Sequence, residues 1–220
     1  MSELPSPADA SAERTYSGVA VAERAAQRRQ RFIEAGIELF GTVGYHATTM
    51  RTLTAATGLT NRYFYESFTT MEDLLVACYE QLMADYRERL SQVLDAAAGG
   101  VELRLRAGLT CFFEAMTNPQ FAQVTHREVL GVSPRVDELY SRHMGEFAEL
   151  MMEYLERAGV PIASHDPREM ALVGAALAGS AIHAAAAWVR SRYSAPIGVV
   201  VEATLKIFLG AVGQLQAPRS

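Results

Sequence analysis

A short run of the sequence, Thr-Asn-Arg-Tyr-Phe-Tyr-Glu-Ser from Thr60 onward, carries side chains whose chemistry suits nucleic acid. Two phenylalanines four residues apart form an apolar stripe on a helix, which leaves a polar face that includes Tyr63. On that face a guanidinium can pair with O6 and N7 of guanine, an amide with adenine, and a carboxylate with the cytosine amino group. We therefore expect Arg62 to read guanine, Asn61 to read adenine and Glu66 to read cytosine.

The residues just before this run predict a second short helix and a tight turn that would position it. Thr49 can cap a helix whose apolar face includes Leu53. Gly58 then allows a left-handed turn, Leu59 can fill the angle between the helices, and Thr60 can cap the polar helix. This is a helix-turn-helix pattern. Residue types alone leave an ordinary helical hairpin with a solvated polar side as the alternative.

The segment Phe40–Leu75 resembles the DNA-binding region of the tetracycline-repressor (TetR) family of transcriptional regulators. The resemblance is carried by Gly44-Tyr45, Thr48-Thr49, Gly58-Leu59-Thr60, Tyr65, Phe68 and Glu72-Asp73-Leu74-Leu75. It implies contacts to the DNA backbone from these positions: Thr49, Arg51, Thr60, Tyr63, Tyr65 and Ser67. Met71 departs from the family, which often has a phosphate-contacting lysine there. That contact is therefore in doubt.

Basic residues are concentrated near the N-terminal end of the chain. The net charge is −5, yet from Arg14 to Arg62 arginines exceed acidic residues by four. A local basic region favours binding to double-stranded DNA, because its cationic side chains displace the counterions of the phosphates. Arg24, Arg28, Arg29 and Arg31 form a cluster there. We expect Arg28 to reach the DNA backbone, with a plain solvated face as the open alternative.

The pattern along the whole chain predicts an all-α fold of two domains. The polar residues 1–17 read as a disordered arm, residues 18–70 as the three-helix DNA-binding domain, and residues 71–220 as a helical effector-binding and dimerisation domain. The first helix should cover residues 21–43, and Thr70 with Asp73 should cap the fourth. Cys78 and Cys111 fall in apolar helical patterns and read as buried free thiols, as expected in a reducing compartment.

The last two predicted helices are apolar. Residues 170–189 carry no charge, but they are rich in alanine and include His183, so a packed helix fits better than a membrane span. The following helix presents another apolar stripe. The family resemblance implies that two such helices from each of two chains form a four-helix interface. We expect these residues to lie in that interface: Gly179, Ala185, Val201, Phe208 and Val212.

The middle helices mix methionines, aromatic residues and isolated polar groups, which could line an apolar effector pocket or simply form the core. The candidate pocket residues are Phe112, Phe113, Met116, His126, Tyr140, His143, Met144, Phe147, Met151 and His183. No pair of histidine, cysteine or carboxylate residues has metal-ligand spacing, so we expect no metal. We also expect no cofactor.

Together these features predict a cytoplasmic, homodimeric regulator that is not an enzyme. It would bind an inverted repeat in double-stranded DNA through two recognition helices. A small apolar or aromatic effector would favour one of two domain orientations and so change DNA binding, with repression favoured over activation. Two alternatives stay open: an all-α enzyme or small-molecule carrier with an incidental helix-turn-helix, and a regulator that responds to a protein partner.

Overall fold

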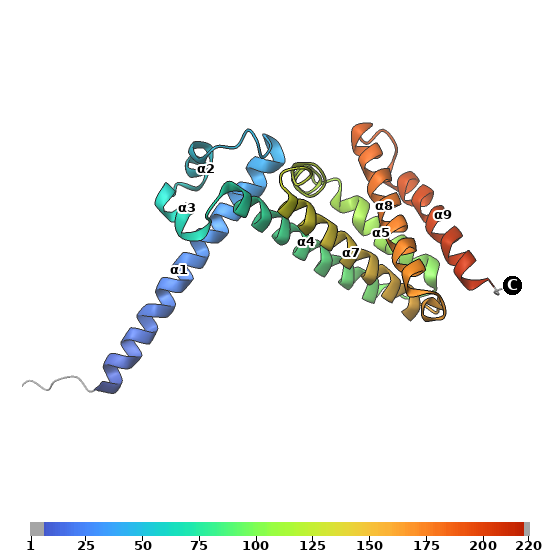
Figure 1. Ribbon diagram of the computed structural model, residues 1–220, viewed down its shortest axis with the longest axis horizontal. Helices are drawn as coiled ribbons and strands as arrows, with labels where there is room; N and C mark the ends of the chain where they lie inside the picture. Colours follow the sequence, from blue (N-terminus) through green and yellow to red (C-terminus); the bar gives the residue numbers. More distant parts are fainter. Residues whose placement is uncertain (1–6, 218–220) are drawn as a thin grey trace, which may run out of the picture. The chain divides into compact units, whose positions relative to one another are not determined.

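The computed structural model describes the backbone of residues 7–217 and the side chains of residues 21–217. The described chain contains helices and no β-strand, which confirms the all-α prediction (Figure 1). The elements are α1 (Pro7–Thr42), α2 (Met50–Thr57), α3 (Asn61–Ser67), α4 (Met71–Ala96), α5 (Val101–Ala115), α6 (Pro119–Gln123), the π-helical turn η1 (Val124–Glu128), α7 (Pro134–Arg157), the 3-10 turn η2 (Ile162–Ser164), α8 (Pro167–Arg190) and α9 (Ile197–Gln216).

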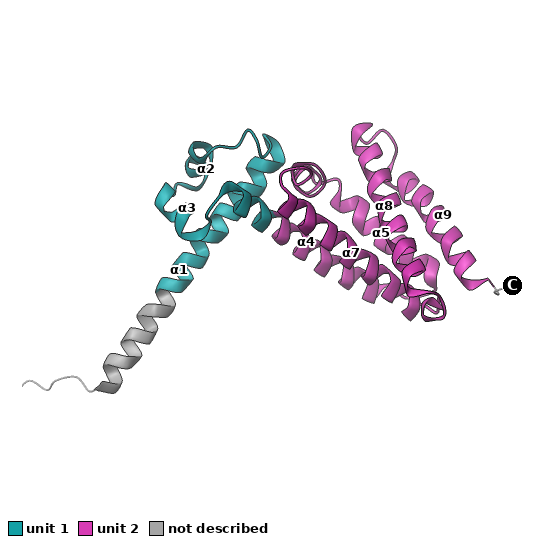
Figure 2. Ribbon diagram, viewed as in Figure 1, with its two compact units in different colours: residues 1–78 teal, residues 79–220 magenta. Residues whose placement is uncertain are grey.

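The chain divides into two compact units, residues 1–78 and residues 79–220 (Figure 2). The division falls after Cys78 rather than after Thr70, where the sequence suggested it. The reason is that the first turns of α4 pack on α1: the thiol of Cys78 donates to the carbonyl of Ile33 over 3.4 Å. The beginning of α4 is thus part of the core of the first unit.

Helix α1 begins well before the expected start at Val21. Its backbone is helical from Pro7, so most of the segment predicted as a disordered arm is helix here, while residues 1–6 lie outside the described residues. Proline is tolerated in the first turn of a helix, and alanine, glutamate and arginine, frequent after it, have high helix propensity. These local preferences outweigh the polar composition from which we predicted an arm.

The core of the first unit is an aromatic cluster that holds α3 against α1. The ring of Phe32 meets Phe64 edge-to-face at a centroid distance of 5.5 Å and Phe68 at 6.5 Å. Farther along α1, Gly36 lies against α4, where an added Cβ would come within 2.7 Å of the Cys78 sulfur. The small residue therefore permits the close approach of the two helices.

The turn between α2 and α3 follows the predicted chemistry at one end and departs from it at the other. Thr49 forms a capping box with Thr52, and Gly58 has a left-handed φ of 66°. Thr60 has the extended backbone of a cap, but its hydroxyl makes no capping bond. Instead its carbonyl accepts from the backbone of Tyr63. The predicted side-chain cap of α3 is therefore wrong.

The fourth helix starts as predicted, because Thr70 and Asp73 form a capping box at the start of α4.

Within the second unit, α5 packs on α9 and α7 packs on α8 (Figure 1). Helices α8 and α9 are long and apolar enough to cross a membrane by length and composition, and 28% of the apolar window of each is buried. Their buried faces join the core, and their other faces leave small and apolar residues exposed.

Candidate DNA-binding surface and effector cavity

The polar face of α3 is exposed. Phe64 is fully buried beneath it, whereas Tyr65 is 63% exposed and the Arg62 side chain 85% exposed. Asn61 and Thr60 are also exposed at the start of the helix. The apolar stripe thus turns the polar side chains outward, as the spacing predicted. These side chains extend from a helix that is anchored by an aromatic core.

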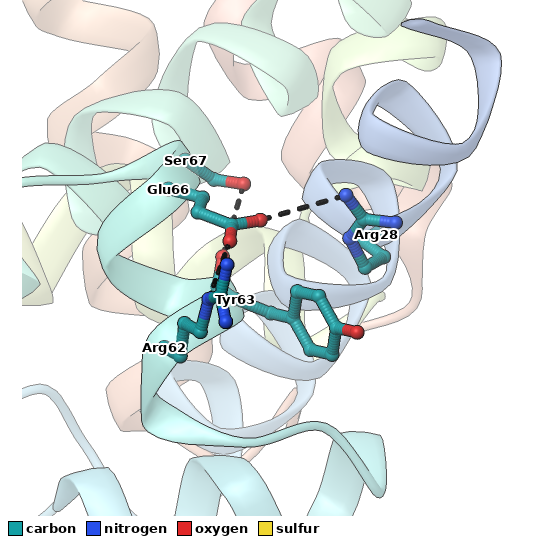
Figure 3. A network of polar contacts seen from close by, with 5 residues as sticks. All are labelled: Arg28, Arg62, Tyr63, Glu66 and Ser67. Atoms are coloured by element: carbon teal, nitrogen blue, oxygen red, sulfur yellow. Dashed lines mark hydrogen bonds and ion pairs between the residues drawn. The ribbon is translucent and has the colours of Figure 1, made fainter. Parts of the chain in front are cut away.

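A small ionic network crosses from α3 to α1 (Figure 3). Glu66 accepts from the Arg62 Nε over 3.1 Å and pairs with Arg28 over 3.5 Å. The Arg28 guanidinium also lies over the ring of Tyr63, 4.5 Å from its centre, and the hydroxyl of Ser67 donates to the Tyr63 carbonyl. Exposed ion pairs contribute only about 0.2–1 kcal/mol each, so the network orients these side chains more than it stabilises the fold.

The network changes the role expected for Glu66. Its carboxylate is engaged by two guanidinium groups, so it has less freedom to accept from a cytosine amino group than the sequence suggested. The side chain instead holds Arg28 and Arg62 beside one another. Glu66 thus bridges the two arginines in this structure.

Two arginines of the α1 cluster, Arg29 and Arg31, pack against other elements of the first unit. Arg31 donates to the carbonyl of Thr57 at the end of α2, and Arg29 lies over the ring of Phe68 at 5.0 Å. Both side chains thereby join α1 to other elements of the first unit. Neither of the two alternatives weighed from the sequence, phosphate contact or plain solvation, includes this packing role.

The threonines at the starts of the two short helices differ. The hydroxyl of Thr49 is occupied by the capping box, while that of Thr60 is exposed and makes no hydrogen bond within the described chain. Arg51 is exposed on α2. Thr60 and Arg51 are thus better placed than Thr49 to meet a phosphate. Met71 is half-buried at the start of α4.

A cavity of about 140 Å³ lies within the second unit and is lined by residues from α4 through α9. Its lining is mostly apolar. Five of the residues expected at an effector pocket line it: Phe112, His126, Met144, Phe147 and Met151. An engineered apolar cavity of about 150 Å³ is known to hold benzene, so this space suits a compact ligand. Longer molecules would require the methionine side chains to move, which their flexibility permits.

The other five expected pocket residues do not line the cavity. Phe113 and Met116 are buried in the core, where Phe113 packs edge-on against Trp188 at 5.8 Å. Tyr140 and His143 pack instead around the fully buried Tyr79. His183 is exposed on α8. The periodicity placed each side chain on an apolar or a polar face but could not distinguish cavity wall from packed core.

Several cavity residues were not among the sequence candidates. Tyr86 lines the cavity and packs against Phe147 at 5.2 Å, and Arg104 lines it while donating to the carbonyl of Leu94. Gly108, in the middle of α5, also borders the cavity. A glycine inside a helix costs stability, and that cost was the one sequence signal that could have pointed to this place.

Two histidines in this unit differ in their surroundings. Burial lowers the pKa of His126 to about 4, so its imidazole is neutral near pH 7. Burial also lowers the pKa of His143, against the opposing effect of Glu146 3.7 Å away. Burial raises the pKa of the Tyr86 phenol as well. The polar groups of the cavity are therefore uncharged at His126 and Tyr86.

The residues expected at a dimer interface separate into two groups. Ala185, Val201, Phe208 and Val212 are buried in the core of this same chain, and Phe208 lines the cavity. These four side chains thus pack within this chain, where the apolar stripe of α9 lies against α5. Gly179 alone of the five is exposed.

The exposed faces of α8 and α9 carry apolar residues of their own. Leu172 is 73% exposed, Val199 56% and Ile207 54%. A Cβ added at Gly179 or Gly210 would meet nothing within 4 Å in this chain. The chain's own packing therefore does not require glycine at these exposed positions.

Comparison with known proteins agrees with this architecture. Residues 32–78 match the model of bacterial regulatory proteins of the tetR family. Among curated proteins, none matches the chain. Solved structures with the same fold include the fatty acid degradation regulator FadR from Bacillus halodurans, with a TM-score of 0.71 and 17% identity, covering 87% of this chain and 97% of that one.

Two further structures share the fold. FadR from Bacillus subtilis, in complex with stearoyl-CoA, has a TM-score of 0.70 and 16% identity over 81% of this chain and 96% of that one. A TetR-like regulator from Rhodococcus sp. RHA1 has a TM-score of 0.64 and 18% identity, with 84% and 96% covered. The match to the family model thus covers residues 32–78, in the first unit. The chain as a whole has the fold of transcriptional regulators of this type, with a helix-turn-helix DNA-binding domain.

Proposed function

We propose that this protein is a homodimeric transcriptional regulator that is released from an inverted-repeat operator when a small apolar molecule fills the cavity of its second unit. The observation that carries the proposal is the apolar cavity of about 140 Å³ in a chain that also has a tetR-type DNA-binding domain. A largely apolar space with few polar groups is the usual form of a small-molecule site. The stearoyl-CoA complex of the FadR from Bacillus subtilis supports ligand binding by this fold.

The DNA contact is proposed for the outward face of α3. The exposed Arg62 would reach guanine and Asn61 adenine, and Thr60, Tyr65 and Arg51 would contact phosphates. Arg28, Tyr63 and Ser67 lie in or beside the network around Glu66 and would fix the direction of the Arg62 side chain. Thr49 would act on the contact with the DNA backbone only indirectly, by capping α2.

The dimer is proposed to form through the exposed faces of α8 and α9. Leu172, Val199 and Ile207 would lose water there, and Gly179 and Gly210 would let two backbones approach. A two-fold pair of DNA-binding domains would then meet an inverted repeat, with half-sites separated by about one helical turn or a multiple of it. Such a regulator would work in the cytoplasm, and the proposal gives it no enzymatic activity.

Selection of bound sequences from random double-stranded DNA tests this proposal. The expected result is an inverted repeat bound by two copies of the chain, with weaker binding as salt rises. Recovery of no preferred sequence, together with tight binding of a small molecule, would favour a carrier. An operator whose binding responds to no small molecule would favour a regulator controlled by a protein partner.

A further inference from the structure

The position of a single proton in the cavity wall follows from the hydrogen bonds around His126. This histidine lies in the π-helical turn η1, a rare geometry that often marks functional sites. Its Nδ1 is 2.6 Å from the hydroxyl oxygen of Thr125, which is almost completely buried. The Thr125 hydroxyl also donates to the carbonyl of Phe121 over 2.6 Å.

A threonine hydroxyl carries only one hydrogen. Because Thr125 gives that hydrogen to Phe121, it can only accept from His126, so the imidazole must carry its proton on Nδ1. The low pKa that burial gives to His126 agrees with a neutral ring. In a neutral imidazole protonated on Nδ1, the other nitrogen, Nε2, is a hydrogen-bond acceptor with a free lone pair.

This acceptor has no partner within the described part of the chain, and it is not sealed. Among the described residues, Tyr79 Oη is the one buried side-chain nitrogen or oxygen without a hydrogen-bond partner. His126 Nε2 is therefore accessible to water, and the His126 side chain lines the cavity. Tyr86, which lines the same cavity, likewise makes no hydrogen bond with its hydroxyl in the described chain. The rings of both residues pack against Phe121, at 5.5 Å for Tyr86 and 6.1 Å for His126.

Resting on the proposed effector cavity, we propose that the effector is a compact, uncharged, hydroxyl-bearing molecule of the phenol class, whose O–H donates to Nε2 of His126. The size follows from the cavity volume, and the apolar body from its lining. The hydroxyl is required because a ligand that displaces water from this acceptor without donating to it leaves the acceptor unpaired, which is costly, and a donor in the ligand removes that cost. A carboxylate fails at this position, since it has no hydrogen to donate to Nε2.

The experiment measures the affinities of phenol and toluene by calorimetry. The two molecules have nearly the same shape and differ by one hydroxyl. The wild-type protein should bind phenol about tenfold more tightly than toluene, the equivalent of one hydrogen bond. In His126→Phe the ring remains but the acceptor is lost, so the preference should disappear or reverse. His46→Phe, which changes an exposed histidine of the first unit, is the matched control and should keep the tenfold preference.

A second variant tests the proton assignment without altering the histidine. Thr125→Val keeps the shape of the side chain but removes the hydroxyl that fixes the Nδ1 proton, so the preference for phenol should shrink. Thr125→Ser should retain it. Equal binding of phenol and toluene by the wild type, or an unchanged ratio in both His126→Phe and Thr125→Val, would overturn the inference while the apolar cavity stood. If neither molecule binds, the effector cavity itself is wrong and the inference falls with it.

Discussion

In the first unit, the residues proposed to contact DNA stand on the outside of α3 and are supported by an aromatic core. In the second unit, the residues proposed to contact an effector come from seven elements and line a cavity. The first site depends on local spacing, because the seven-residue helix α3 shows one face outward once Phe64 and the following Phe68 are buried. The second site depends on the packing of helices that are far apart in the sequence and that leave an unfilled volume between them. Four predictions test this contrast, from the largest expected effect to the smallest.

The buried and exposed faces of the last two helices should respond differently to a charge. Ala185→Glu would bury a carboxylate in the chain's own core and should destabilise the fold by more than about 4 kcal/mol, which leaves little soluble protein. Ile207→Glu, on the exposed face of α9, should remain folded but become monomeric. Circular dichroism and light scattering measure the two effects. A soluble dimer from Ile207→Glu would place the interface elsewhere.

The neutral histidine in the cavity wall should make the second unit sensitive to acid. Its pKa is near 6.5 in the unfolded chain and about 4 in the folded one, so only the unfolded form gains a proton between these values. Its contribution to stability is therefore complete above pH 6.5 and is lost as the pH falls toward 4, by at most roughly 3 kcal/mol. Urea unfolding at several pH values measures this. The loss should be smaller by that amount in His126→Phe, and equal slopes in the two proteins would refute the burial of this ring.

Two glycines compare packing in the two units. Gly36→Ala should destabilise the first unit by about 1–3 kcal/mol, because the new Cβ meets the Cys78 sulfur at 2.7 Å. Gly108→Ala should instead stabilise the second by up to about 1 kcal/mol, since Leu94, 3.2 Å away, can shift into the adjacent cavity. Denaturant unfolding of both variants tests the difference. Rescue of Gly36→Ala by Cys78→Ala would confirm the named contact, and equal effects of both glycine changes would contradict it.

The exposed face of α3 should separate base reading from backbone contact. Arg62→Ala should cost about 1–3 kcal/mol of DNA binding and flatten the preference at one base pair in each half-site. Tyr65→Phe should weaken binding to all sequences alike and by less. Glu66→Gln should resemble a mild form of Arg62→Ala, because it loosens the ion pairs to Arg28 and Arg62. Unchanged base preferences in Arg62→Ala would make this residue a phosphate contact.

The sequence was sufficient for most of the fold and for the exposed polar face. The cap at Thr49, the left-handed Gly58 and the capping box at Thr70 were predictable because each depends on a few adjacent residues. Helical periodicity also separated Phe64 from Tyr65. These features are local, and short-range sterics and hydrogen bonding fix them.

The rest depends on contacts between residues far apart in the chain. Phe113 and Phe112 are neighbours in the sequence, yet one packs on Trp188 and the other lines the cavity. Val201 and Phe208 showed an apolar stripe, but periodicity could not say whether α5 or a second chain would cover it. The ion pairs of Glu66 likewise require α1 beside α3. Packing between residues far apart in the chain decides these outcomes. The spacing of residues along the sequence does not carry that information.

The most direct test of the proposed coupling measures whether filling the cavity releases DNA. Fluorescence anisotropy would follow a labelled operator, obtained by site selection, during titration with phenol for the wild type and for Met151→Trp, whose larger side chain should occupy the cavity. The account predicts release of DNA from the wild type and a much weaker response from Met151→Trp. Persistent DNA binding by the wild type at saturating phenol, shown by calorimetry to be bound, would contradict it.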